Sequence, residues 1–427
     1  GLRGRGVYLF RKIDEPRRNG LSAENERAAC RAEKRARRAA LQKKEKRRRN
    51  MKLTTAGESH GKALVAIIEG LPAHLKIDKA RADEELKLRQ SGFGRGARQK
   101  IETDKVEILA GVRNGETLGS PVALCIYNRD YENWKTIMSD EPCDVSARTL
   151  TKVRPGHADL SGVLKYAQTD ARNILERASA RETAVRVAAG SVFRSYLSAL
   201  GIEIAGYVRE VCGIKDEGRY TFDEIKGSRS RSLGMLNEKS EKAAEEKISA
   251  LKAEGDTAGG VAEIRVRGLK SGFGSPMTYS DKLDARLARG LMSIQAVKGV
   301  EVGMGFGAAS ASGQEVHDEI FCDEKTRTFY RKTNRAGGIE GGMSNGEEIV
   351  LRVAMKPIPT LMKGLQTVDV STKKSAVAAS ERSDVCAIFA LEIIAEAAVA
   401  EVLAETVAER LGGDTMEEVK ERYSRLP

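Results

Sequence analysis

Two histidines in short, glycine-containing segments are the side chains best suited to proton transfer. His60 lies in residues 57–61, GESHG, and His157 lies in residues 154–159, RPGHAD. Glycine lets the backbone turn sharply and approach a ligand, and imidazole exchanges protons near neutral pH. One loop histidine is more often a solvated or hydrogen-bonded structural residue. Two of them, in a chain with only four histidines, favour a functional site.

Arginines gather near these loops and indicate an anionic ligand. Residues 88–98, LRQSGFGRGAR, place three arginines on a glycine-rich loop, among them Arg89 and Arg95. Guanidinium groups offer paired donors to phosphate or carboxylate, and Arg154 and Arg382 are further candidates for such contacts. The alternatives are a solvated charged loop or an RNA-binding segment. Neither explains the ordered strands and glycine loops that surround it.

Two further segments have the composition of ligand-binding loops. In residues 176–184, ERASARETA, Ser179 and the free N–H groups of a following helix are able to hold a phosphate, although spacing alone favours a simple helix cap. Residues 337–346, GGIEGGMSNG, suit close backbone approach to a flat or phosphorylated ligand and match neither a P-loop nor a dinucleotide-binding fingerprint. Asp384 is either an N-cap or a catalytic carboxylate. These features together suit an anionic substrate and a large phosphorylated cofactor.

The elements that must position these loops are strands and helices without strict alternation. Strands are expected over residues 52–56, 64–69, 106–112, 121–127, 202–208 (half-buried), 261–266 and 349–355. Helices are expected from an Asp78 cap to Leu88 and over residues 181–200 (amphipathic), 237–253 (charged, on the surface), 281–298 and 384–411 (apolar and buried). The order predicts an α+β fold in which helices cover antiparallel sheets.

The charge is concentrated at one end of the chain. The whole sequence has 73 basic and 61 acidic residues, for a formal charge of +12. Residues 1–50 hold 18 basic and 6 acidic residues, which leaves 55 of each in residues 51–427. We therefore expect two parts: a basic, low-complexity and disordered extension over residues 1–50, and a single catalytic domain over residues 51–427.

Three interpretations of residues 1–50 stay open. The first is an upstream extension without activity. The second is an organelle transit peptide, which the acidic residues disfavour. The third is a nucleic-acid-binding arm, which lacks interleaved aromatic residues for base stacking. The third interpretation carries an alternative function for the protein, that of a nucleic-acid-binding protein.

Composition excludes several other classes. No run of about 18 apolar residues is present, so we expect no membrane span. The first residues lack the apolar core of a secretory signal. The six cysteines are dispersed without a CxxC pair, which indicates reduced thiols in a cytoplasmic protein and no metal site.

The same motifs closely resemble the chorismate synthase family. Eight segments occur in the family's order, which makes the resemblance specific from about Met51 to beyond Cys386. They are GESHG (57–61), GRGAR (94–98), RPGHAD (154–159), ERASARETA (176–184), FGSP (273–276), SIQAVKGVEVG (293–303), AGGIEGGMSNG (336–346) and RSD (382–384). Residues 1–50 have no counterpart.

The resemblance implies a lyase of the shikimate pathway, which serves aromatic amino acid biosynthesis. The family converts 5-enolpyruvylshikimate 3-phosphate to chorismate and phosphate by trans-1,4-elimination. Phosphate leaves C3 and a hydrogen leaves C6. Reduced FMN is required but not consumed, and is thought to lend an electron transiently. An inactive relative that retains the flavin fold is the third option, which intact His60, His157 and Asp384 disfavour.

Site roles carry over residue by residue. His60 matches the proton donor to the leaving phosphate, His157 the histidine that manages flavin protonation, and Asp384 the carboxylate that assists proton removal by way of flavin N5. The substrate carries one phosphate and two carboxylates, and its contacts match Ser59, Arg89, Arg95, Arg154 and Arg382. Arg89 and Arg95 also match positions assigned to NADPH.

FMN contacts carry over to a second set of positions. They are Arg177, Ala178, Ser179, Gln295, Ala296, Gly341, Lys356, Pro357, Ile358, Pro359, Thr360 and Arg382. Some relatives carry Asn at the position of Gln295, and others carry serines near the end of residues 356–360. The resemblance further implies helices sandwiched between two antiparallel sheets, a homotetramer, and an external flavin reductase or NADPH as the source of electrons.

Overall fold

The structure is a computed structural model that describes residues 51–96, 102–378 and 384–427. The predictions made for residues 1–50 and for Arg382 lie outside these ranges. The chain divides after Arg48, and residues 49–427 form one compact unit. No helix of the described residues is long and apolar enough to cross a membrane.

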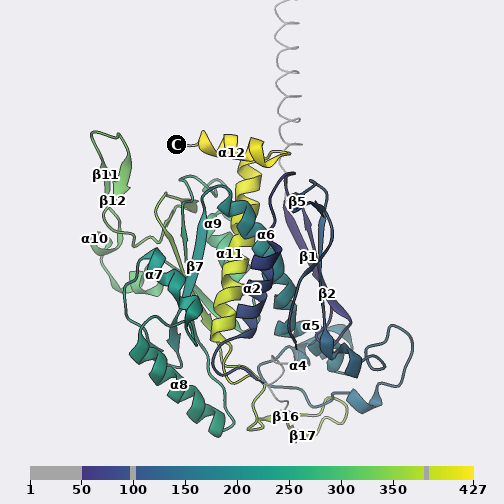
Figure 1. Ribbon diagram of the computed structural model, residues 1–427. Helices are drawn as coiled ribbons and strands as arrows, with labels where there is room; N and C mark the ends of the chain where they lie inside the picture. The colour runs from purple at the N-terminus through teal and green to yellow at the C-terminus, as the bar shows by residue number, and fades with distance from the viewer. Residues whose placement is uncertain (1–50, 97–101, 379–383) are drawn as a thin grey trace, which may run out of the picture. The chain divides into compact units, whose positions relative to one another are not determined.

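Two antiparallel sheets form the outer layers (Figure 1). The first has four strands in the order β1 (Lys52–Ala56), β2 (Ala63–Glu69), β6 (Val122–Tyr127) and β3 (Glu107–Ala110). The second has five strands in the order β10 (Val297–Val302), β15 (Ile349–Met355), β9 (Gly260–Arg267), β7 (Glu203–Val211) and β8 (Ile214–Lys215). All pairings between these strands are antiparallel.

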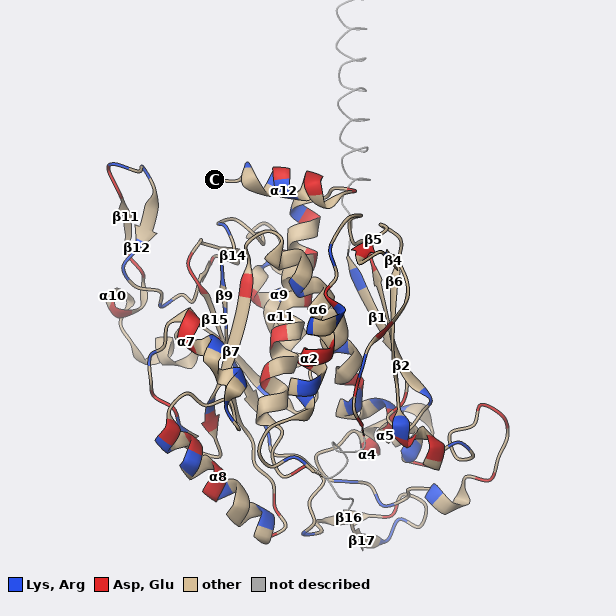
Figure 2. Cartoon of the chain, viewed as in Figure 1, with Lys and Arg blue, Asp and Glu red and all other residues tan. Residues whose placement is uncertain are grey.

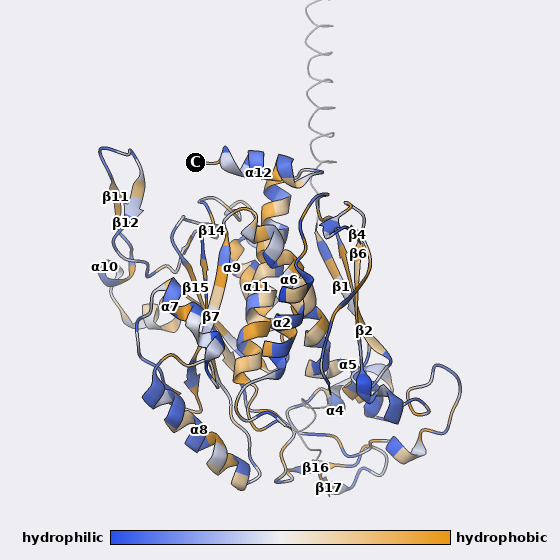
Figure 3. Cartoon of the chain, viewed as in Figure 1, coloured by the Kyte–Doolittle hydropathy of each residue, from blue (hydrophilic) through white to orange (hydrophobic). Residues whose placement is uncertain are grey.

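Helices fill the space between the sheets. They are α2 (Lys79–Gln90), α6 (Thr183–Ser198), α9 (Leu283–Met292) and α11 (Ile388–Leu411). Helix α11 contacts α6, α9, α2 and the second sheet, and α6 contacts the first sheet. Figure 3 shows α11 rich in apolar residues and α2 mixed, whereas α8 (Glu238–Ala253) on the outside is hydrophilic and, in Figure 2, densely charged. The predicted sandwich of helices between antiparallel sheets is confirmed.

The remaining elements are short, apart from the terminal helix. The helices are α4 (Asp159–Tyr166), α5 (Arg172–Ala178), α7 (Phe222–Lys226), α10 (Gly313–Val316) and α12 (Met416–Ser424). The strands are β4 (Val112–Arg113), β5 (Glu116–Thr117), β11 (Ile320–Cys322), β12 (Phe329–Arg331), β13 (Ile339–Glu340), β14 (Met343–Ser344), β16 (Gln366–Val368) and β17 (Ser375–Val377). The 3-10 helices η1 (Arg129–Asn133), η2 (Ser146–Arg148) and η3 (Ala180–Glu182) complete the part that positions the site.

A glycine sets the distance between the two longest helices of the middle layer. A Cβ atom on Gly190 of α6 would lie 2.4 Å from the Cβ of Ala397 on α11. Real Cβ atoms do not approach so closely, so only glycine allows this crossing. Both helices are buried along nearly all of their length.

Several predicted elements differ from the observed ones. The helix predicted over residues 281–298 ends at Met292, because Ala296 adopts a left-handed φ of 69° and the chain continues as β10. Helix α11 begins at Ile388, so the interpretation of Asp384 as its N-cap is wrong. The predicted half-buried strand, β7, is buried on both faces, because Ala205 and Tyr207 pack beneath α7. Helix α6 was predicted to be amphipathic, but it is buried along nearly all of its length and has no exposed face of that kind.

The contact between α9 and α11 predicts a stability that depends on pH. Burial, together with repulsion from Glu401, raises the pKa of Glu405 from 4.5 to about 7. Ionising Glu405 therefore costs the folded state more than the unfolded state, so stability falls as the pH rises from about 4.5 to 7. Because Glu405 is partly exposed, we expect Glu405→Gln to raise the free energy of unfolding at pH 8 by only about 1–2 kcal/mol.

Thermal denaturation at pH 5 and pH 8 measures this effect. The gain should be present at pH 8 and nearly absent at pH 5. Glu409→Gln is the matched control, because Glu409 also pairs with Arg286 but is more exposed. An equal gain at both pH values would contradict the account.

Candidate active site

His60 lies between β1 and β2 in a loop that its surroundings hold closely. Gly57 has a φ of 113°, and a Cβ atom there would lie 2.4 Å from the carbonyl oxygen of Ala63. The side-chain amide of Asn128 donates to the carbonyls of Glu58 (3.1 Å) and Gly61 (2.7 Å). The loop is thus fixed on both sides of His60, whose side chain is buried.

Glu176 on α5 is the partner of His60. It accepts hydrogen bonds from the backbone N–H of His60 (2.8 Å) and from Nδ1 of its ring (2.9 Å). Burial acts to raise the pKa of Glu176, but the hydrogen bonds from His60 and the charge of Arg172 outweigh burial and lower it. An ionised carboxylate only accepts, so Nδ1 carries the proton and Nε2 remains to exchange one.

His157 has an equivalent carboxylate partner in Asp159, the first residue of α4. Nδ1 of His157 lies 2.5 Å from Asp159, and Arg154 donates to the same carboxylate through Nε at 2.9 Å. Asp159 is fully buried. Burial favours a raised pKa, but the hydrogen bonds and charges of His157 and Arg154 dominate and hold the pKa of Asp159 well below its usual range.

The carboxylates of the two histidine–carboxylate pairs come from two neighbouring helices. Glu176 lies on α5 and Asp159 lies on α4, and these two helices pack against each other. Gly162 of α4 makes room for Ile174 of α5, whose Cγ2 would lie 2.3 Å from a Cβ at that glycine. A small apolar core lies beneath both helices and consists of Leu150, Val153, Val163, Ala171 and Leu175.

Glu182 joins residues that the resemblance assigns to FMN. It accepts hydrogen bonds from Thr55 (2.8 Å) and from the amide of Gln295 (3.4 Å), and it lies 3.9 Å from Arg177. Arg177 in turn donates to Thr55 and to the carbonyl of Gly57, in the loop that carries His60. The predicted flavin residues on α5 and before β10 are therefore neighbours of that loop.

Lys356 extends the connection to the loop of His157. Its backbone N–H donates to the carbonyl of Ala296 (3.0 Å), and its ammonium group donates to the carbonyl of Gly156. Farther along, Thr360 accepts from Arg154 (3.3 Å), and the carbonyl of Ile358 accepts from Thr257 (2.8 Å). Residues 356–360 thus lie against the RPGHAD loop.

These residues fit a bound FMN in their chemistry, because the arginine and serine donors suit its phosphate and the buried acceptor suits one of its N–H or O–H groups. Oε1 of Gln295 is buried and has no hydrogen-bond partner among the described residues. Buried polar atoms are normally paired, so an unpaired acceptor here points to a group that the protein itself does not supply. Arg177 is partly exposed beside it, and Ser179 caps η3, with its hydroxyl 3.2 Å from that of Ser59. Ala178, the last residue of α5, lies between the two.

Asp384 pairs with the glycine-rich arginine loop. It accepts from the backbone N–H of Gly96 (2.6 Å) and lies 2.9 Å from a guanidinium nitrogen of Arg95. Burial is the main cause that lowers the pKa of Arg95, and its Nε is buried without a hydrogen-bond partner within the described ranges. Val385 continues the pairing by donating to the carbonyl of Gly94 (2.8 Å).

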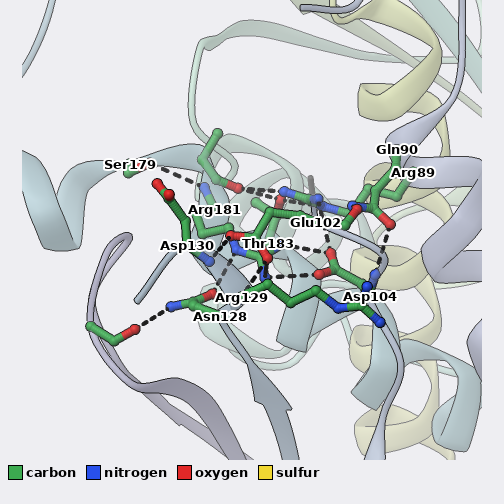
Figure 4. Close-up of polar contacts among 12 residues, drawn as sticks. Arg89, Gln90, Glu102, Asp104, Asn128, Arg129, Asp130, Ser179, Arg181 and Thr183 are labelled. Carbon is green, nitrogen blue, oxygen red and sulfur yellow. Dashed lines mark hydrogen bonds and ion pairs between the residues drawn. The ribbon is translucent and has the colours of Figure 1, made fainter. Parts of the chain in front are cut away.

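Arg89 belongs to a buried polar network (Figure 4). Its Nε donates to Thr183 (2.9 Å), and one terminal nitrogen donates to the carbonyl of Ala180 (2.8 Å). Burial lowers the pKa of Arg89 to about 9. The third nitrogen lies 3.9 Å from Asp104, which also binds Arg181 through both of its oxygens (2.6 and 2.8 Å). Two of the three nitrogens of Arg89 thus donate to protein groups.

Some predicted residues are not brought to this site by any contact among the described residues. Gly341 forms the turn between β13 and β14, whose next residue, Gly342, packs on Lys282. Two cavities lie elsewhere, one on the side of the five-stranded sheet that bears Arg265 and Arg352, and one beside α2 and α6. Neither is lined by His60 or His157.

Sequence reasoning missed the groups that orient the two histidines. Asp159 follows His157 by two residues, so its proximity was readable from the RPGHAD motif. Glu176 is 116 residues from His60, and Trp134, whose ring stacks on that of His60, is far from both. The only sequence signal for a site role of Glu176 was its place in the ERASARETA segment.

Comparisons with known proteins agree on one family. A family model described as chorismate synthase matches residues 51–408. A chorismate synthase of Caldicellulosiruptor bescii is 51% identical over 380 residues, covering 88% of this chain and 99% of that one. One of Alkaliphilus metalliredigens is 50% identical over 373 residues, covering 87% and 98%. A crystal structure titled as chorismate synthase has 38% identity and a TM-score of 0.71, covering 88% of this chain and 97% of that one.

The buried pair of Arg154 and Asp159 predicts a loss of stability on substitution. Asp159→Asn leaves the buried Arg154 guanidinium without its counter-ion, so we expect the free energy of unfolding to fall by about 3 kcal/mol. Because the pKa of Asp159 is lowered in the folded state, its stabilising effect is complete above about pH 4 and is lost only as the pH falls toward the folded value. Denaturation at pH 6 and at pH 8 should therefore both show a loss.

The exposed Asp144 provides the control. Asp144→Asn should leave the denaturation midpoint unchanged at both pH values. Asp159→Asn with the denaturation midpoint of the wild-type protein would contradict the assignment of an ionised, buried carboxylate.

Proposed function

The chain belongs to the chorismate synthase family, and on that premise we propose that its site converts 5-enolpyruvylshikimate 3-phosphate to chorismate and phosphate by 1,4-elimination that requires reduced FMN. The observation that carries the proposal is a pair of imidazoles, each hydrogen-bonded to a buried carboxylate. The two carboxylates lie on the packed helices α4 and α5. A lyase that loses phosphate from one carbon and a proton from another needs two separately controlled proton positions.

His60 serves the leaving phosphate. Glu176 holds the Nδ1 proton, so Nε2 is the atom that gives a proton to the departing oxygen. The same hydrogen bond from Nδ1 to Glu176 holds the ring in place for this transfer. Ser59 precedes His60 and accepts a hydrogen bond from the hydroxyl of Ser179. Its own hydroxyl adds a donor for the same anion.

We assign His157 to the control of flavin protonation. Asp159 orients its ring through Nδ1, in the manner in which Glu176 orients His60. Asp384, paired with Arg95, is the carboxylate that we assign to proton removal from the substrate side. Arg95, Arg154 and Arg89, with Arg382 outside the described residues, supply positive charge for a substrate with three acidic groups.

The flavin would be held by Arg177, Ala178, Ser179, Gln295, Ala296, Gly341 and residues 356–360. When bound, reduced FMN supplies the electron chemistry that lets the phosphate leave. The proposal is supported by the unpaired Oε1 of Gln295 and by Glu182, which accepts from Gln295 and lies 3.9 Å from Arg177, so that the contacts on α5 and before β10 are neighbours.

The proposal extends to how the enzyme operates. We propose a cytoplasmic homotetramer that takes its electrons from NADPH or from an external flavin reductase. Cys125, Cys143, Cys212, Cys322 and Cys386 are free thiols, in agreement with a reducing compartment. Analytical ultracentrifugation tests the tetramer, and phosphate release with and without NADPH tests the electron source.

An anaerobic phosphate-release assay tests the reaction. Purified protein with reduced FMN should release one phosphate and form one chorismate for each substrate consumed, while oxidised FMN should support neither. Folded, FMN-saturated protein that releases no phosphate would refute the proposal. A chain that begins at Met51 should retain the activity if residues 1–50 take no part in catalysis.

Substitution of each imidazole tests the two proton roles. We expect His60→Ala and His157→Ala each to slow turnover by about 10²–10⁴-fold, the usual range for the loss of a general acid or base. His74→Ala is the matched control, because His74 is exposed and pairs only with Glu116 among the described residues. Wild-type turnover in either site variant would remove that histidine from the mechanism.

A further inference from the structure

Trp134 is the only tryptophan of the chain, and it lies beside His60. It follows η1 in the long excursion that connects β6 to α4, and it is only 8% exposed. The excursion therefore folds back to bury this ring against the candidate active site, although most of its other residues are exposed.

The indole and the imidazole are stacked. Their ring centroids are 4.0 Å apart, and their planes are inclined by 28°. The guanidinium carbons of Arg148 and Arg172 lie 4.7 and 5.0 Å from the centroid of the indole. Arg172 also approaches the carboxylate of Glu176 at 3.3 Å, so one arginine contacts both groups that touch the imidazole.

Trp134 is itself held in place. Its indole N–H donates to the carboxylate of Asp130 (3.2 Å), and its backbone N–H donates to the carbonyl of Tyr131 (2.8 Å). Farther along the excursion, Arg148 is held by Arg172, whose Nε donates to the carbonyl of Arg148 (2.5 Å). A ring fixed by its own hydrogen bond is able to restrain its neighbour, not merely fill space beside it.

We propose that Trp134 is a positioning residue for His60. Glu176 fixes the Nδ1 edge of the imidazole but leaves the ring free to tilt about that hydrogen bond. Stacking on the indole fixes the plane of the ring, and the two restraints together fix the direction of Nε2. The inference rests on the proposed function, in which Nε2 gives a proton to the leaving phosphate, and proton transfer depends steeply on that direction.

Two substitutions separate restraint from simple packing. Trp134→Phe keeps a stacking ring, and Trp134→Leu fills part of the space without one. We expect Trp134→Leu to lower kcat by about 10–100-fold with KM changed by less than about 3-fold, and Trp134→Phe to retain kcat to within about 3-fold. Equal losses in both variants, or a loss confined to KM, would overturn the proposal.

A double substitution tests whether the effect passes through His60. If Trp134 acts by orienting the imidazole, Trp134→Leu should cause no further loss of kcat once His60→Ala is present. A purely structural role predicts the same proportional loss in both backgrounds, and that result would overturn the proposal. Thermal denaturation of every variant separates misfolding from misorientation.

Tryptophan emission gives a readout that needs no turnover. Because Trp134 is the only indole, His60→Ala should shift the emission of the unliganded protein to longer wavelength as the stacked face becomes hydrated. His157→Ala is the matched control and should leave the emission unchanged. Emission that does not change in His60→Ala would overturn the stacked arrangement.

Failure of the proposed function and failure of the positioning role give different results. Wild-type protein that released no phosphate would remove the proposed function and, with it, the role of Trp134. Active wild-type protein with Trp134→Leu at full rate would remove the positioning role alone.

Discussion

An ionised carboxylate buried beneath each imidazole is the constraint on which the site depends. Taking Glu176 and Asp159 out of water is unfavourable unless cations and N–H groups surround them. Arg172 and Arg154 meet that need at the cost of their own hydration, and the histidine rings complete the shell. The loops of His60 and His157 are therefore fixed because the charges beneath them tolerate no other arrangement.

The same principle operates beside these loops and in the middle layer of helices. Arg181 grips Asp104 with two hydrogen bonds, and Arg194 reaches Glu396 in the middle of α11, where both groups are buried. Such pairs contribute little net stability compared with apolar packing. They do penalise any shift of one element past its neighbour, because a shift would leave a buried charge alone. The middle layer thereby gives the site a fixed frame.

Local patterns in the sequence predicted the framework well, and they predicted the site only in part. The alternation of β15 and the Asp78 cap of α2 depend on neighbouring residues alone, and both are observed. The end of α9 at Met292 was missed, and the pattern of residues 281–298 gave no sign of the left-handed φ of Ala296 beyond it. Likewise, the motifs indicated both histidines, whereas Glu176 and Trp134 reach His60 only through the folding of distant segments.

The lack of a side chain at Gly190 affects the spacing of elements other than α6 and α11. Because α6 abuts the first sheet and α11 abuts the second, their closest approach determines the thickness of the whole sandwich. Homologous enzymes that keep this contact would inherit the same spacing between sheets. Changes in the length or composition of the excursions at the rim would then leave the spacing between the sheets unaltered.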